Sequence, residues 1–231
     1  MSFKIKVCGL TDLVDVRAAM AAGADMLGFI FFAGSPRCVK PEQVRRILDE
    51  AQPNQAGFVT VGVFVNDSPQ HVAQVLDFCG LDFAQLHGDE PPAALGNTSE
   101  DRGPLCSRAY KALRPRSIKE ASHLAQSYAL PPHLRSAGRL PAFLIDAYHP
   151  TQRGGTGETG DWRLAQSLAG RYPLLLAGGL TPANVAQAIH SIHPWGVDVA
   201  SGVEQSPGRK DHAALRAFFS AVKQAERIDQ K

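Results

Sequence analysis

Two residues that can exchange protons stand at the ends of predicted strands. Cys8 follows the run Phe3 to Val7, whose apolar residues recur at every second position, as in a β-strand. Asp146 closes the apolar run that begins at Phe143, where a carboxylate needs a partner or a function. A thiol that has lost its proton can act as a base, and a protonated carboxyl group can act as an acid. The pair therefore suits acid–base chemistry.

Each of the two residues also has a purely structural explanation. Cys8 could be a small buried side chain, and Asp146 could cap a backbone or pair with Arg37 or Arg153. For catalysis near neutral pH, Asp146 must keep a proton while Cys8 loses one, and burial hinders the second change. The Cys8 thiolate then needs a stabilising positive charge or dipole from Lys6, Arg37 or backbone N–H groups, and the sequence leaves open which one supplies it.

Glycine-containing pairs follow the last two predicted strands. Gly178-Gly179 comes after the strand Leu174 to Ala177, and Ser201-Gly202 comes after the strand Val197 to Ala200. Glycine leaves backbone N–H groups open to a ligand, and the start of the next helix favours an anion. The pattern predicts a phosphate site, and the alternative is that the glycines only form tight turns.

Two more polar residues lie just after predicted strands. Arg37 ends the loop 33–37, and its guanidinium suits a carboxylate or phosphate, unless it is only an exposed loop residue. His87 follows the strand Phe83 to Leu86 and could orient a ligand or hydrogen-bond within its own turn.

The elements that must position these residues alternate regularly. Apolar runs predict strands at 3–7, 26–32, 58–65, 83–86, 108–112, 143–146, 174–177 and 197–200. Helical periodicity, proline and glycine signals predict helices at 13–22, from 41 through 48, and at 69–78, 91–95, 118–128, 162–168, 182–189 and 212–225. The segments 97–105 and 131–140 are predicted as loops.

Eight strands, each followed by a helical segment and with no hairpin signature between them, predict an α/β fold, a single (β/α)8 barrel over residues 1–231. In such barrels the chemistry lies at the carboxyl ends of the strands. The predicted site therefore faces the same side as Cys8, and the loops 97–105 and 131–140 lie on the other side.

Composition narrows the range of partners and compartments. The chain has 231 residues, 44% of them hydrophobic, and a net charge of +2, which argues against nucleic-acid and membrane-surface partners. No apolar stretch approaches a membrane span and no signal peptide is evident, so we expect a cytoplasmic protein. The spacing of Cys8, Cys38, Cys79 and Cys106 suggests neither a zinc site nor a disulfide framework, and Cys79 is expected to be a buried hydrophobe.

Seven motifs in register resemble the phosphoribosylanthranilate isomerase family. They are Lys6-Val7-Cys8-Gly9-Leu10-Thr11, Ser35-Pro36-Arg37, Gln85-Leu86-His87-Gly88, Leu144-Ile145-Asp146, Gly154-Gly155-Thr156-Gly157, Leu176-Ala177-Gly178-Gly179-Leu180 and Val199-Ala200-Ser201-Gly202-Val203-Glu204. They span nearly the whole chain, whereas the loops 97–105 and 131–140 are longer than expected of the family.

The resemblance implies an Amadori rearrangement in tryptophan biosynthesis, without cofactor or metal. N-(5-phosphoribosyl)anthranilate would become 1-(2-carboxyphenylamino)-1-deoxyribulose 5-phosphate, with Asp146 as the acid and Cys8 as the base. Arg37 would face the anthranilate portion of this phosphorylated small molecule. The other implied substrate-binding residues are His87, Gly155, Gly157, Gly178, Gly179, Ser201 and Gly202.

Other functions remain open from the sequence. One alternative is another enzyme with a sugar-phosphate barrel, such as an epimerase or the related histidine-pathway isomerase. The latter typically uses two aspartates where this chain has Cys8 and Asp146. A barrel that binds a phosphorylated metabolite without catalysis is another. The sequence does not distinguish a monomer from a homodimer.

Overall fold

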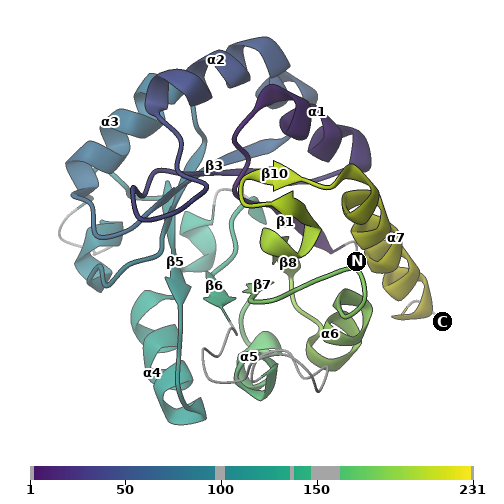
Figure 1. The fold of residues 1–231 in the computed structure, drawn as a ribbon. Helices are drawn as coiled ribbons and strands as arrows, with labels where there is room; N and C mark the ends of the chain where they lie inside the picture. Colours follow the sequence, from purple (N-terminus) through teal and green to yellow (C-terminus); the bar gives the residue numbers. More distant parts are fainter. Residues whose placement is uncertain (1–2, 97–101, 136–137, 147–161, 230–231) are drawn as a thin grey trace.

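Eight parallel strands close into a barrel in chain order, with β8 paired to β1 (Figure 1). The computed structural model describes residues 3–96, 102–135, 138–146 and 162–229. The strands are β1 (Lys4–Val7), β2 (Met26–Ile30), β3 (Val59–Phe64), β4 (Phe83–Leu86), β5 (Ala109–Leu113), β6 (Phe143–Asp146), β7 (Leu174–Ala177) and β8 (Gly196–Val199). The predicted (β/α)8 fold class is confirmed.

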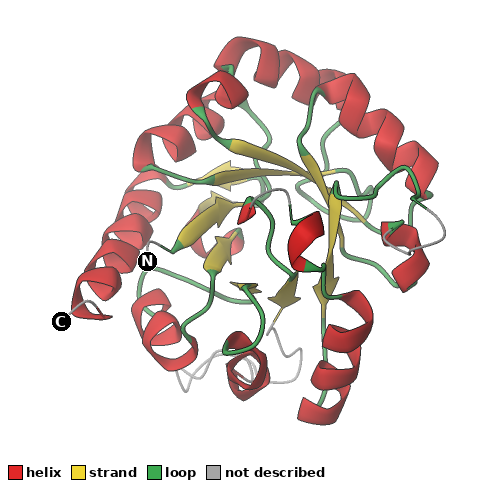
Figure 2. Cartoon of the chain, turned by 180° about the vertical axis from the view of Figure 1, so that it is seen from behind, coloured by secondary structure: helices red, strands yellow, loops and turns green. Residues whose placement is uncertain are grey.

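Helices form a ring around the strands, as both views of the ribbon show (Figures 1 and 2). They are α1 (Leu13–Ala22), α2 (Pro41–Ala51), α3 (Pro69–Cys79), α4 (Ile118–Tyr128), α5 (Trp162–Ala169), α6 (Val185–Ile192) and α7 (His212–Asp229). In the described part of the connection after β4, the helical segment is a short 3-10 helix, η2 (Pro92–Leu95). Short 3-10 helices also occur at η1 (Pro53–Ala56), η3 (Pro132–Leu134) and η5 (Ser201–Val203). The loop prediction at 97–105 falls partly on residues outside the described ranges.

Local sequence signals explain where the first helix begins and ends. The Asp12 side chain accepts a hydrogen bond from the backbone N–H of Asp15, which caps the start of α1. Gly23 ends the helix with φ +98°, a conformation that side chains disfavour. These signals place the end of β1 and the start of α1 as the sequence predicted, with Cys8 in the short connection between them.

One pair of strands was not predicted. Between β8 and α7 the chain forms an antiparallel hairpin of β9 (Glu204–Ser206) and β10 (Arg209–Lys210). Strands this short carry no readable alternation, and the turn depends on Gly208, whose φ is +80°. Element boundaries also shift: β2 ends at Ile30 instead of Phe32, and α6 begins at Val185 instead of Pro182.

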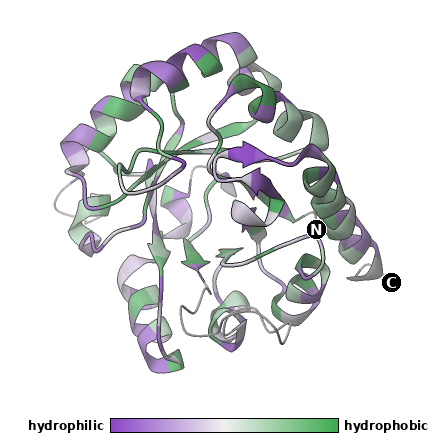
Figure 3. Cartoon of the chain, in the orientation of Figure 1, coloured by the Kyte–Doolittle hydropathy of each residue, from purple (hydrophilic) through white to green (hydrophobic). Residues whose placement is uncertain are grey.

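The barrel core is apolar with a few buried polar side chains. In Figure 3 the strands β6 and β7 are green, whereas the surrounding helices mix green with hydrophilic purple. Buried polar groups inside the barrel include Lys6, Gln85, Tyr110 and Asp198, all less than a tenth exposed. Because a buried polar group costs free energy unless it is paired, these side chains are candidates for a role other than packing.

Candidate active site

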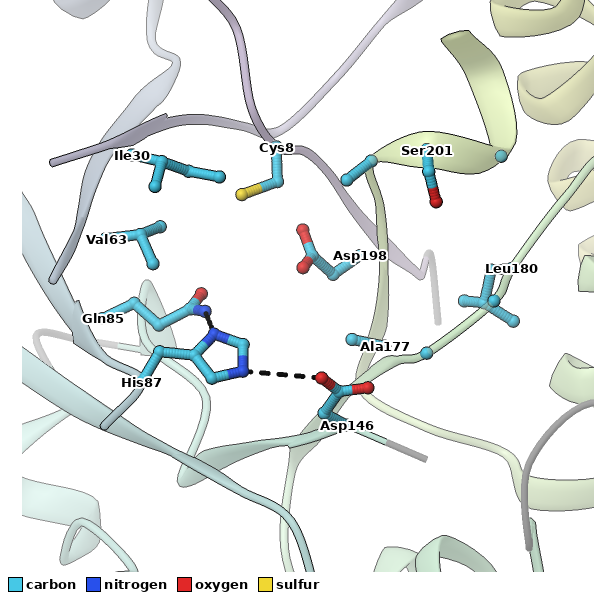
Figure 4. A pocket seen from close by; sticks show the side chains of 14 residues that line it. Cys8, Ile30, Val63, Gln85, His87, Asp146, Ala177, Leu180, Asp198 and Ser201 are labelled. Atoms are coloured by element: carbon cyan, nitrogen blue, oxygen red, sulfur yellow. Dashed lines mark hydrogen bonds and ion pairs between the residues drawn. The ribbon is translucent and has the colours of Figure 1, made fainter. Parts of the chain in front are cut away.

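A cavity of about 240 Å³ opens at the carboxyl ends of the barrel strands. It brings together predicted site residues from both halves of the chain (Figure 4). The lining residues are Cys8, Ile30, Val63, Gln85, His87, Asp146, Ala177, Gly178, Gly179, Leu180, Asp198, Ala200, Ser201 and Gly202. Gly155 and Gly157 lie outside the described residues.

Cys8 directly follows β1 and is only 5% exposed. A side chain at Gly28 on the neighbouring strand would place its Cβ 2.9 Å from the Cys8 sulfur, so the glycine leaves the room that the thiol occupies. Beneath Cys8, the Lys6 ammonium forms an ion pair of 3.0 Å with Asp198, its register partner on β8. Cys8 therefore sits directly above a buried charge pair.

Burial raises the pKa of the Cys8 thiol, because the thiolate loses its hydration. Lys6 opposes this most strongly, by its charge and a hydrogen bond, while Asp198 raises the pKa and Lys210 lowers it. Burial would also lower the pKa of Lys6, but Asp198, Cys8 and Tyr110 together raise it, so Lys6 stays charged. Of the groups that the sequence left open, Lys6 is thus the main source of positive charge at Cys8.

Asp146 ends β6 with a side chain that is 22% exposed and points into the cavity (Figure 4). Its Oδ2 lies 3.5 Å from Nε2 of His87. His87 in turn contacts the Gln85 amide, with 2.9 Å between Nδ1 and the amide nitrogen. His87 therefore lies between the interior of the barrel and the predicted acid.

The Arg37 side chain is paired with a carboxylate and does not line this cavity. Its guanidinium makes a bidentate pair with Glu204, with Nε 2.9 Å from Oε1 and Nη2 2.6 Å from Oε2. The Glu204 side chain is 4% exposed and also binds the Lys210 ammonium at 2.9 Å. Among the described residues, those that line the cavity do not include Arg37. Arg37 is therefore held by Glu204, and it is neither a freely exposed loop residue nor seen paired with Asp146. No pattern in the sequence indicated that Glu204 would lie beside it.

The glycine loops after β7 and β8 form one wall of the cavity. Gly178 and Gly179 have φ of +100° and +68°, which only glycine adopts without strain. A Cβ at Gly202 would overlap the carbonyl oxygen of Leu180, so the two loops touch backbone to backbone. The Asn184 side chain braces the first loop by donating to the carbonyl of Gly179 at 3.0 Å. The turn role of these glycines is therefore real, and it is compatible with an anion site.

Sequence reasoning missed three residues of the site: Gln85, Asp198 and Lys210. Asp198 had a readable signal, since it is a lone charge in the strand Gly196–Val199. Gln85 is a lone polar residue in β4 and was equally visible. Lys210 belongs to the unpredicted hairpin and donates to the carbonyl of Cys8 at 2.7 Å.

Two further features bear on the expected partners. Among the residues that the structure describes, no group of three or more His, Cys, Asp or Glu side chains is arranged to hold a metal ion. Over the same ranges, no helix has both the length and the apolar character that crossing a membrane requires. The four cysteines, which all fall within these ranges, are free, and Cys79 is buried as predicted.

Comparison with known proteins points to one activity. Residues 5–221 match the family described as N-(5'phosphoribosyl)anthranilate (PRA) isomerase. N-(5'-phosphoribosyl)anthranilate isomerase of Pelobacter propionicus is 42% identical over 222 residues, which cover 96% of each chain.

Solved structures agree in fold and family. Phosphoribosyl anthranilate isomerase from Thermotoga maritima superimposes with a TM-score of 0.80 at 34% identity, covering 96% of this chain and 99% of that one. A structure of phosphoribosyl anthranilate isomerase in complex with reduced 1-(o-carboxyphenylamino)-1-deoxyribulose 5-phosphate has a TM-score of 0.78 at 32% identity, with the same coverage. The chain therefore belongs to the N-(5'-phosphoribosyl)anthranilate isomerase family.

Proposed function

We propose that Asp146 is the acid and Cys8 the base with which this enzyme isomerises N-(5'-phosphoribosyl)anthranilate in tryptophan biosynthesis. The observation that supports these roles is that a single cavity holds both side chains, although Cys8 follows β1 and Asp146 ends β6. Asp146 gives its proton to the furanose ring oxygen as the ring C–O bond opens to a Schiff base. The Cys8 thiolate takes the proton from C2′, and the resulting enolamine tautomerises to the ketone.

The substrate phosphate binds to the backbone of the loops at Gly178-Gly179 and Ser201-Gly202, with Gly155 and Gly157 contributing from the preceding loop. The positive φ of Gly178 and Gly179, and the position of both loops on the cavity wall, support this assignment. Arg37 is still assigned to the anthranilate portion, which requires its guanidinium to share or leave Glu204. His87 contacts the substrate beside Asp146, because its ring also lines the cavity.

We assign the chain to a single barrel domain that works in the cytoplasm on a phosphorylated small molecule, with neither nucleic acid nor membrane as a partner. The net charge of +2 and the match over residues 5–221 support this assignment.

Cys8→Ser tests the base directly. A hydroxyl is a far poorer base than a thiol at neutral pH, so we expect kcat to fall by about 100-fold or more while the fold is retained. Turnover is followed as the loss of anthranilate fluorescence with freshly generated phosphoribosylanthranilate, and the fold by circular dichroism. Near-wild-type turnover in this variant would remove Cys8 from the mechanism, and absence of turnover in the wild type would favour a binding protein.

A further inference from the structure

A chain of side-chain contacts leads from the interior of the barrel to Asp146. The Tyr110 hydroxyl donates to Oε1 of Gln85 at 2.9 Å, and the amide nitrogen of Gln85 lies 2.9 Å from Nδ1 of His87. Nε2 of His87 then lies 3.5 Å from Asp146 (Figure 4). Gln85, Tyr110 and Asp146 lie on the adjacent strands β4, β5 and β6, and His87 directly follows β4.

Strand geometry holds this network in place. Gln85 and Tyr110 are register partners on β4 and β5, so their side chains point to the same side of the sheet. His87 lies two residues after Gln85 and continues the same face. The backbone N–H of His87 donates to the carbonyl of Phe64 at 2.8 Å, and Gln85 and Tyr110 are at most 1% exposed. The His87 imidazole therefore contacts Gln85, which with Tyr110 forms a buried pair of polar side chains.

The protons in this network can be assigned from the donor at its inner end. Burial raises the pKa of Tyr110, so its phenol keeps its proton and can donate to Gln85. Since Oε1 of Gln85 accepts that proton, the amide turns its N–H group toward Nδ1 of His87. Nδ1 must then accept, and a neutral imidazole whose Nδ1 accepts carries its proton on Nε2. That nitrogen is the one facing Asp146.

We propose that Gln85 and Tyr110 are positioning residues that hold His87 as the neutral tautomer protonated at Nε2, so that His87 donates to the Asp146 carboxylate. The inference rests on the proposed role of Asp146 as the acid. When Asp146 passes its proton to the ring oxygen and the C–O bond breaks, its new negative charge accepts the N–H of His87, which keeps its own proton. A hydrogen bond to the charged form favours proton release, and a distance of 3.5 Å can shorten as the charge develops.

The opposite tautomer would act against the reaction. An unprotonated Nε2 would accept the proton of Asp146 and compete with the ring oxygen for it. The orientation of one buried amide therefore decides whether His87 assists or retains the acid proton.

The tautomer is measured in the wild-type protein without any assay of activity. Long-range ¹H–¹⁵N correlation spectra of uniformly ¹⁵N-labelled protein, with His87 assigned by comparison with His87→Gln, distinguish the two ring nitrogens. We expect a protonated Nε2 and an unprotonated Nδ1 at neutral pH. The reverse pattern, or an imidazolium with both nitrogens protonated, would overturn the inference.

Tyr110→Phe tests the role of the Tyr110–Gln85–His87 network with little change in side-chain shape. It keeps the ring but removes the proton that orients the amide, so we expect a mixture of tautomers and a fall in kcat of about 3- to 30-fold with KM within about 2-fold. Tyr128→Phe is the matched control, because it removes a phenol hydrogen bond of the same length, 2.9 Å to the carbonyl of Glu90, outside this network. It should change neither the spectrum nor kcat.

Gln85→Glu supplies a second and stronger test. It replaces the donor amide with an acceptor, so Nδ1 of His87 must carry a proton, and the spectrum must change. A wild-type tautomer and kcat in both Tyr110→Phe and Gln85→Glu would overturn the inference. If Asp146→Asn proves active while the predicted tautomer is observed, the assignment of the acid fails instead, so the two failures are distinguishable.

Discussion

The residue that most affects Cys8 is Lys6, which lies beneath it in the barrel wall. Lys6 and Asp198 are both nearly inaccessible to solvent, and their ion pair measures 3.0 Å. A buried ion pair rarely adds net stability, because desolvation offsets the attraction. Its use here is electrostatic, since the ammonium favours the thiolate of Cys8 while Asp198 disfavours it. The pair thus affects how readily the thiolate of Cys8, the proposed base, forms.

Lys6→Met should move the titration of Cys8 to higher pH. Removing the positive charge leaves burial and Asp198, both of which raise the pKa of the thiol, so the thiolate forms later as pH rises. The maximal kcat/KM should fall, because less of the enzyme holds the base in its active form. The titration is followed by the ultraviolet absorbance of the thiolate. The absorbance of the same variant carrying Cys8→Ser in addition is subtracted, and this subtraction cancels the contribution of Cys38, Cys79 and Cys106.

Asp198→Asn is the opposing variant for this prediction. It removes the charge that raises the pKa of Cys8 and leaves Lys6 in place, so the titration should move to lower pH. A shift in the same direction in both variants would show that changes in packing, and not charge, dominate the titration of Cys8.

The proposed acid and base were easier to single out from the sequence than the side chains that contact them. Cys8 and Asp146 could be identified because each interrupts a strand pattern at its end. The partner of Arg37 could not be identified in this way, since Glu204 lies 167 positions away in the sequence. Such contacts depend on barrel closure, which periodicity within one segment does not describe.

Among the elements, the β9–β10 hairpin is linked directly to Cys8, the proposed base. From β10, the Lys210 ammonium donates to the carbonyls of Cys8 and Ala200, at 2.7 and 3.1 Å, and pairs with Glu204. These contacts tie the end of β1 to the end of β8. The hairpin therefore braces the loop that carries Cys8, although its strands are too short for the sequence to reveal them.

The contact between the loops after β7 and β8 revises what a substitution at Gly202 should do. From the sequence alone, a bulky side chain at Gly179 or Gly202 is expected to weaken substrate binding more than folding. In the structure, a Cβ would overlap the carbonyl oxygen of Leu180, so Gly202→Ala must displace backbone. We expect a loss of about 1–3 kcal/mol in the free energy of unfolding together with weaker phosphate binding.

Urea unfolding and competition by inorganic phosphate measure these two effects. Gly170→Ala is the control, because a Cβ at Gly170 would meet nothing within 4 Å. Unfolding of Gly202→Ala at the same urea concentration as Gly170→Ala, with unchanged phosphate affinity, would contradict the contact.

Most elements followed from sequence because strand and helix periodicities alternate with clear caps. The predicted bounds of α1, α4, β4, β6 and β7 agree with the structure. The ends of β2 and α6 differ by two or three residues, since the apolar pattern continues beyond the last barrel hydrogen bond in β2 and Pro182 lies in a turn before α6. Gly155 and Gly157 lie outside the described residues, so their role stays a prediction.

For the whole molecule, barrel closure is what creates the site. The proposed acid on β6 and the proposed base after β1 meet at one cavity only because eight parallel strands return to pair β8 with β1. The end of the chain supports the same closure, since the backbone N–H of Phe3 donates to Glu226 on α7 at 2.7 Å. The predicted barrel therefore fixed the side on which the chemistry lies, while the packing inside it determined the partners.

The turnover of Asp146→Asn tests the central claim most directly. An amide cannot give a proton to the ring oxygen, so kcat/KM for phosphoribosylanthranilate should fall by at least about 100-fold from the wild-type value. Inorganic phosphate should bind the variant as it binds the wild type, because the glycine loops are unchanged. A kcat/KM within a few-fold of wild type, measured by loss of anthranilate fluorescence at equal enzyme concentration, would contradict the assignment of Asp146 as the acid.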